Sequence, residues 1–299
     1  MTRIEIYETG ASVVIPSSWD EMTPRQVCEV MKIHELCIVR QASPLEFNIR
    51  VLFYLMGMKH NARSVRWERL ADEESISQRD SNIYMLCERC LGFMFGSDGT
   101  SPSLTYDSTR NVLPIASRGL CRRKLIGPAD ALQDLTFGEF RHASNALTAF
   151  FKSREQCDLD ECIAHLYRRR SSKANRAGRN VEPIDNSTFY ADIRRAASLR
   201  PWQKTFIMLW FSSCINFLQT GTVILDGETI NLSALFSSDV DGKPTDIVNT
   251  WTDLAINIAK EGTIGTMERI DEEPLYSIIK LMWHNHKENK RNEQIRQTS

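Results

Sequence analysis

The sequence predicts a mainly α-helical protein: lobes of antiparallel amphipathic helices, with small β-hairpins at the N-terminus and between helices. Three observations predict this fold class. Apolar residues recur at spacings of three and four over most of the chain, as they do in helices with one buried face. Several of these stretches begin with a Ser or Thr cap. Short alternating apolar segments flank Gly10 and Gly227, which is typical of hairpins.

The N-terminal lobe, residues 1–95, begins with the hairpin around Gly10 and continues as helices. Thr23 and Ser43 are each followed by a proline and, three residues after the cap, by Gln or Glu. A hydroxyl cap, a proline at the first helical position and a reciprocal cap at the third predict that a helix begins after each. Apolar spacing predicts a further helix over residues 82–95.

Residues 96–134 are the least regular part of the chain, and Gly, Ser and Pro are frequent in their first third. We expect an irregular linker region here, between the N-terminal lobe and a C-terminal helical domain over residues 135–290. Residues 291–299 are almost all polar or charged, and we expect them to form a disordered polar tail.

The C-terminal domain opens with a further capping box, in which Thr136 caps a helix and Glu139 is the reciprocal cap. Phe137, Phe140 and Phe151 are expected to point inward from this helix. After it the sequence predicts helices over residues 158–167, 189–199, 201–218, 246–261 and 274–287, and a hairpin over residues 223–232.

Composition limits the class of protein. The chain carries 37 basic and 38 acidic residues, a net charge of -1, so it lacks the basic excess of a dedicated nucleic-acid-binding protein. Eight cysteines lie largely within apolar helical patterns and are expected to be free thiols in a reducing compartment.

The sequence gives no sign of a membrane segment. The longest apolar run, 205–218, is shorter than the roughly 20 residues that span a bilayer, and no signal peptide is recognisable. We therefore expect a cytoplasmic protein without a membrane partner.

Metal and redox sites find little support in the sequence. Cys87 and Cys90 form a CxxC pair, but a structural zinc site needs four ligands and no second pair completes it. Cys157, Cys162 and His165 offer three soft ligands without a fourth. We therefore predict no metal and no cofactor, and interpret these thiols as packing residues.

Catalytic groupings are also lacking, because no nucleophile elbow and no Gly-rich phosphate loop can be recognised. Glu139 and His142 are i,i+3 neighbours, which a solvated helix face would explain. We therefore expect a protein that is not an enzyme and has no catalytic residue.

A basic loop, residues 168–179, is the electrostatic feature with a functional character. Its charge could contact phosphates or an acidic protein surface, and an ordinary solvated loop is the open alternative. It lacks aromatic residues, which argues against base stacking. Trp251 and Trp283 are candidate apolar contact residues, with core packing as their alternative. The candidate basic contact residues are Arg168, Arg169, Arg170, Lys173, Arg176 and Arg179.

Four stretches carry a family resemblance. They read LTFGEF at 135–140, LDECIAHLYR at 159–168, LWF at 209–211 and AKEGTIGT at 259–266. With the order of helix starts and loops over residues 130–290, they resemble helical tail-assembly proteins of tailed bacteriophages and prophages.

That resemblance implies a non-enzymatic role in virion assembly, in which a chaperone-type protein holds a helical, tape-measure-like partner through protein–protein contacts. The implied partners are other phage tail or assembly proteins, with a homo-oligomer as an option, and the implied location is the cytoplasm of the bacterial host or the virion itself. Helical grooves with apolar floors suit such a task. The alternative is a nucleic-acid-associated protein that uses the basic loop 168–179, and a salt titration would distinguish the two because phosphate contacts weaken steeply with salt.

Overall fold

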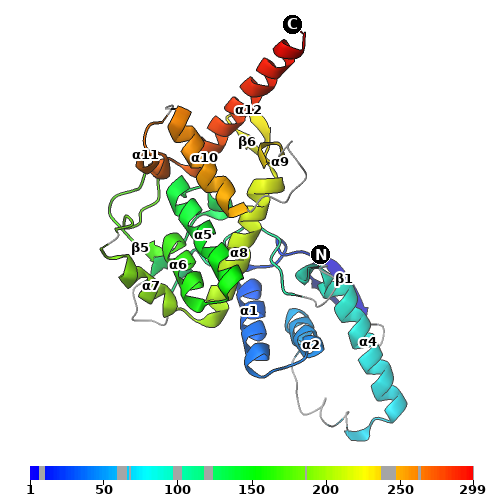
Figure 1. Cartoon of the computed structure of the whole chain (residues 1–299). Coiled ribbons are helices and arrows are strands. Elements are labelled where there is room, and N and C mark those ends of the chain that lie inside the picture. The colour runs from blue at the N-terminus through cyan, green and yellow to red at the C-terminus, as the bar shows by residue number, and fades with distance from the viewer. Residues whose placement is uncertain are drawn as a thin grey trace. The chain divides into compact units, whose positions relative to one another are not determined.

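The computed structural model describes residues 1–6, 11–58, 66, 69–96, 103–117, 124–185, 187–236, 247–261 and 264–298. It is mainly α-helical with small antiparallel β-ladders, which confirms the predicted fold class (Figure 1). The chain divides into two compact units. Unit 1 comprises Met1–Ser108 and Pro201–Leu209, and unit 2 comprises Thr109–Arg200 and Trp210–Ser299. The first boundary falls inside the predicted linker, whereas no local sequence signal indicates that Pro201–Leu209 belongs to unit 1.

Unit 1 begins with the expected antiparallel hairpin, in which Ile4 lies opposite Val13. The predicted helix over 82–95 begins earlier than expected, because the Asp72 side chain accepts a hydrogen bond of 2.7 Å from the backbone N–H of Ser75 and caps the helix there. The elements of unit 1 are β1 (Thr2–Ile6), β2 (Ala11–Ile15), α1 (Pro24–Val39), α2 (Pro44–Leu55), α4 (Glu73–Leu91), the 3-10 turn η1 (Gly92–Met94) and the first part of α8 (Pro201–Thr220).

The predicted hydroxyl caps of unit 1 are present, but the reciprocal cap forms at Thr23 and not at Ser43, where the Glu46 side chain accepts from Arg50 instead. Thr23 accepts from the backbone N–H of Gln26 at 3.3 Å, and the Gln26 side chain accepts from the backbone N–H of Thr23 at 2.8 Å. Ser43 accepts from the backbone N–H of Glu46 at 3.2 Å. Each cap satisfies backbone donors that a helix leaves without partners, which stabilises the helix by about 1 kcal/mol.

Aromatic contacts hold the core of unit 1 together. Trp19 is buried, with its ring centroid 5.7 Å from Phe93 and 5.1 Å from Tyr106. Tyr106 in turn meets Phe206 edge to face at 5.3 Å. Phe206 lies in the first part of α8, so this ring contact explains why Pro201–Leu209 belongs to unit 1 although it is distant in sequence.

Unit 2 is built around α5, which packs against α6, α10, α11 and α12. Strand β4 lies between β3 and β5 in a small antiparallel sheet, and α5, α6 and α7 pack on one another in sequence order. The elements of unit 2 are β3 (Ile115–Ala116), β4 (Leu125–Ile126), the 3-10 turn η2 (Asp130–Leu132), α5 (Phe137–Ser153), α6 (Gln156–Leu166), β5 (Arg168–Arg169), α7 (Phe189–Ala197), the remainder of α8, β6 (Thr222–Leu225), β7 (Glu228–Asn231), α9 (Ser233–Phe236), α10 (Ile247–Glu261), α11 (Met267–Glu272) and α12 (Leu275–Thr298).

The core of unit 2 contains the aromatic rings expected from α5 and α10. The ring of Phe140 lies 6.0 Å from Phe211 and 4.8 Å from Trp251. Phe151, expected to point inward, is exposed, because α5 ends two residues later where Arg154 adopts a left-handed conformation with φ 61°.

Two features near the end of the chain bear on the sequence expectations. The predicted hairpin over 223–232 is present as β6 and β7, with positive φ at both Asp226 and Gly227, as a type I′ turn requires. Helix α12 continues to Thr298, so the tail expected to be disordered is helical up to that residue. The start predicted at residue 246 for α10 lies outside the described residues.

None of the described helices combines the length and apolar character needed to cross a membrane.

Candidate functional site

The basic loop folds back on itself after β5. Arg168 in β5 pairs with Ile126 in β4, and Arg170 bridges to Val181. Within the loop the backbone N–H of Asn175 donates to the carbonyl of Arg179 at 2.9 Å. These backbone hydrogen bonds give the loop a defined conformation, whereas its composition suggests an ordinary loop whose charged side chains are all in solvent.

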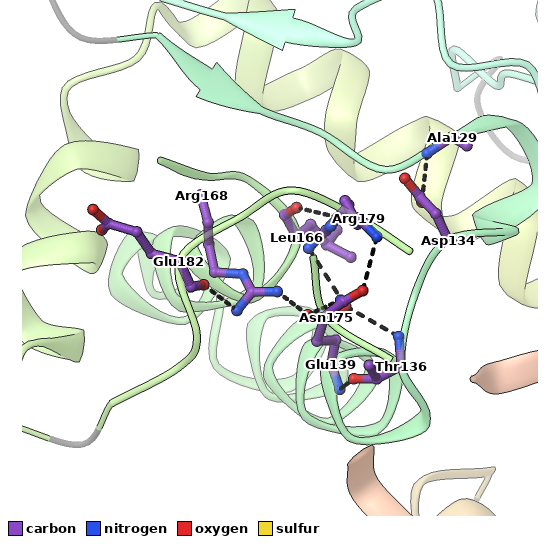
Figure 2. A network of polar contacts seen from close by, with 9 residues as sticks. All are labelled: Ala129, Asp134, Thr136, Glu139, Leu166, Arg168, Asn175, Arg179 and Glu182. Atoms are coloured by element: carbon purple, nitrogen blue, oxygen red, sulfur yellow. Dashed lines mark hydrogen bonds and ion pairs between the residues drawn. The ribbon is translucent and has the colours of Figure 1, made fainter. Parts of the chain in front are cut away.

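Glu139 in the first turn of α5 binds this loop (Figure 2). Its Oε1 accepts from Asn175 Nδ2 at 3.2 Å and forms an ion pair with Arg168. Its Oε2 accepts from the backbone N–H of Thr136 at 3.1 Å and lies 3.4 Å from Arg179 Nη2. One carboxylate therefore completes the predicted capping box and also ties the loop to α5.

Both guanidinium groups in this network are withdrawn from solvent, with Arg168 2% and Arg179 3% exposed. Arg168 Nη1 donates to the carbonyl of Glu182 at 2.7 Å, and Arg179 Nη1 donates to that of Leu166 at 3.0 Å. Burial lowers the pKa of Arg168 to about 9, with a further contribution from Arg179, and burial lowers the pKa of Arg179 to about 10. Both groups remain charged at neutral pH, so two buried cations share the carboxylate of Glu139.

This geometry corrects two sequence expectations. Glu139 is not on a solvated helix face, since it is 5% exposed. The six basic residues of the loop do not form one surface either. Arg168 and Arg179 point inward. Two others have acidic partners, since Arg169 pairs with Glu182 at 2.6 Å and Arg176 pairs with Glu272 and Glu273. The remaining two, Arg170 and Lys173, are exposed without an ion pair among the described residues.

A polar pocket of about 510 Å³ lies beside Glu139 and is also lined by His142, Arg176 and Asp271. Its charges are already balanced. Arg141 donates to both carboxylate oxygens of Asp271, at 3.1 and 2.6 Å. Because these charged groups already have internal partners, the pocket presents little free charge to a ligand.

Stability should fall as the pH drops through the range in which histidine titrates. Partial burial, then Arg141 and His165, lower the pKa of His142, whose side chain is 46% exposed, so the unfolded chain binds a proton somewhat more readily than the folded chain. The resulting stability is present above the unfolded pKa of about 6.5 and is lost as the pH falls toward the folded pKa. We expect a lower melting temperature at pH 5.5 than at pH 7.5, and a smaller difference in His142→Gln. An unchanged difference in that variant would contradict the assignment.

The thiols of the described cysteine groupings have raised pKa values. Burial raises the pKa of Cys87 to about 11 and also raises the pKa of Cys90, which disfavours the reactive thiolate. Cys157 is exposed whereas Cys162 is buried, so the two do not converge on a shared site. Across the described part of the chain, no group of three or more His, Cys, Asp or Glu side chains could hold a metal ion.

The two candidate tryptophans lie in different environments. Trp251 is 1% exposed and packs against Phe140, so it belongs to the core. Trp283 is half-buried, donates from Nε1 to Glu228 Oε1 at 2.8 Å and stacks on His286. Of the two, Trp283 therefore remains a candidate surface contact.

An open groove in unit 1 was not indicated by the sequence. It lies between β1, the end of α2 and α4, and its volume is about 690 Å³. Asn82, Met85, Leu86 and Arg89 follow i, i+3, i+4, i+7 spacing, so one face of α4 forms a wall. The groove is lined by Ile4, Glu5, Met56, Asn82, Met85, Leu86, Glu88 and Arg89.

The groove has an adaptable apolar lining. Met85 is 62% exposed, and Met56 stands at the other side of the groove. Methionine is unbranched and polarisable, so it can fit partners of different shape. Helical periodicity indicates which residues of α4 share an apolar face, but it gives no signal for a groove that also involves β1 and α2.

No family model, no curated protein and no solved structure matches this chain.

Proposed function

We propose that the chain is a non-enzymatic assembly protein of a tailed bacteriophage or prophage, which binds an amphipathic helix of a partner such as a tape-measure-like tail protein. The resemblance over residues 130–290 supports the class of protein. The observation that carries the mode of action is the open apolar groove of unit 1.

The groove offers an amphipathic helix both apolar surface and charged groups, because Glu5, Glu88 and Arg89 line it together with the apolar residues. Ile4, Met56 and Leu86 supply apolar surface. An amphipathic helix presents anchors at i, i+3 or i+4, and i+7, which such a surface accommodates. Each fully buried Leu or Met anchor contributes about 1.5–3 kcal/mol, so a few anchors suffice for a reversible complex.

The replacement Met85→Asp should weaken partner binding by roughly 10- to 100-fold, because it puts a charge where an apolar anchor must be buried. The exposure of Met85 means that folding should be little affected. The binding partner would be the long helical tape-measure-like protein encoded near the gene for this chain, and the dissociation constant would be measured by calorimetry.

The replacement Met58→Asp provides the matched control, since Met58 is 51% exposed and does not line the groove. Equal losses in the two variants, or wild-type chain that does not bind the helical protein, would contradict the proposal.

The nucleic-acid alternative has less support. Of the six basic residues, Arg170 and Lys173 are exposed and form no ion pair among the described residues. Two phosphate contacts would give a slope of about −2 for the logarithm of affinity against that of salt concentration, compared with about −5 for six. The small number of exposed basic residues without an ion pair is the reason we favour the protein-binding proposal over the nucleic-acid alternative.

A further inference from the structure

The second half of α12 presents its side chains to solvent. Every described side chain between residues 287 and 296 is exposed, and Figure 1 shows this part of the helix extending away from the rest of unit 2. The stretch 287–298 is about 18 Å long. The packed first half of α12 nucleates this stretch, but the exposed side chains of the stretch add little tertiary packing of their own among the described residues, so docking on another surface would stabilise it further. We name residues 287–298 the α12 arm.

The α12 arm combines positive charge with one exposed apolar side chain. Ile295 is 54% exposed. Arg291 is one helical turn before it, and Arg296 is adjacent to it. The arm carries Lys287, Lys290, Arg291 and Arg296 against Glu288 and Glu293.

The unit 1 groove has the complementary character. Its lining includes Met85, the carboxylates of Glu5 and Glu88 and the guanidinium of Arg89, so acidic groups outnumber basic ones by one. Both carboxylates are exposed at the surface, where Glu5 lies 3.4 Å from Arg3 and Glu88 accepts from Tyr84 Oη at 2.8 Å. Along α4 and its cap, outside the groove lining, four acidic residues stand against one basic residue: Asp72, Glu73, Glu74 and Asp80 against Arg79. Ile295 fits the apolar lining, and the arginines beside it fit the carboxylates.

We propose that the α12 arm of one copy docks into the unit 1 groove of a second copy. Each copy then offers one arm and one groove, and such a head-to-tail contact produces rings or open chains of copies. This self-association goes beyond the proposed function, because it needs no other protein; the α12 arm and the partner helix then compete for one groove. Charge-assisted pairing of Arg291 with Glu88 selects the register, and burial of Ile295 against Met85 provides the apolar part of the contact.

Sedimentation of the purified 299-residue chain over a range of concentrations tests the proposal. We expect the average mass to rise with concentration, and the rise to require higher concentration as salt is added. A chain that ends after His286 should stay monomeric. A wild-type chain that is monomeric throughout, or a shortened chain that associates like wild type, would overturn the proposal.

A charge exchange makes the test specific. Arg291→Glu and Glu88→Lys should each weaken self-association by at least about tenfold, and the double variant should recover most of it. Both side chains are exposed, so the fold should be retained, which circular dichroism would verify. Lys173→Glu, an exposed cation outside both surfaces, serves as control. Failure of the double variant to recover association would reject the Arg291–Glu88 pairing. A wild-type chain that self-associates but does not bind the helical partner would count against the proposed function alone.

Discussion

Replacing Glu139 with Ala is expected to destabilise unit 2 by about 3–5 kcal/mol, among the largest effects of any single substitution in this chain. The change removes the carboxylate that Arg168 and Arg179 share and leaves two buried guanidinium groups without it. An uncompensated buried charge costs several kcal/mol because the low-polarity interior solvates it poorly. The capping box of α5 is lost as well. Urea denaturation monitored by hydrogen exchange of α5 amides would measure the loss.

Two comparisons separate charge from shape in this experiment. Glu46→Ala breaks the exposed ion pair with Arg50 and should cost less than about 1 kcal/mol. Combining Glu139→Leu with Arg168→Met and Arg179→Met removes the buried charges together and should recover much of the stability. If Glu139→Ala were as mild as Glu46→Ala, the ion network would not be what holds the loop.

Replacing Trp251 with Ala should also cost about 3–5 kcal/mol, because a buried ring is lost and a cavity remains. Its ring contacts Phe137 at 6.3 Å and Phe140 at 4.8 Å, so α10 loses its main aromatic contact with α5. Thermal unfolding of the variant followed by near-ultraviolet circular dichroism would report the change.

The Trp283→Ala variant is the matched control, since Trp283 is half-buried and its indole N–H bonds to exposed Glu228. We expect a loss of no more than about 1 kcal/mol there. Similar losses at Trp251 and Trp283 would contradict the different environments assigned to the two tryptophans.

Local chemistry made several parts of this fold predictable. The Thr23 and Thr136 capping boxes form with the partners that their spacing indicates. The Asp226-Gly227 turn also has the expected positive φ angles. These features depend on residues within a few positions of one another, so they can be read from a single sequence. Fold class followed for the same reason, since helical periodicity is a local property.

The sequence was a poorer guide to which residues form the candidate contact surfaces. The basic loop was recognised by its charge, but the number of residues free for a partner depended on Glu139, which lies far from the loop in sequence. The groove joins β1, the end of α2 and α4, which no periodicity places together. The assignment to a phage assembly family stays a prediction, and the binding experiment with the helical protein addresses it.

The sequence by itself determined most of the longer helices, their hydroxyl caps and the two hairpins, because each depends on neighbouring residues. The tertiary structure alone decided that Glu139 neutralises part of a buried cluster, that Pro201–Leu209 joins unit 1 and that Met85 lies exposed on a groove wall. The physical reason is that burial and charge pairing arise from contacts between distant segments. A helical pattern shows which face is apolar, but the packing of other segments decides whether that face is covered.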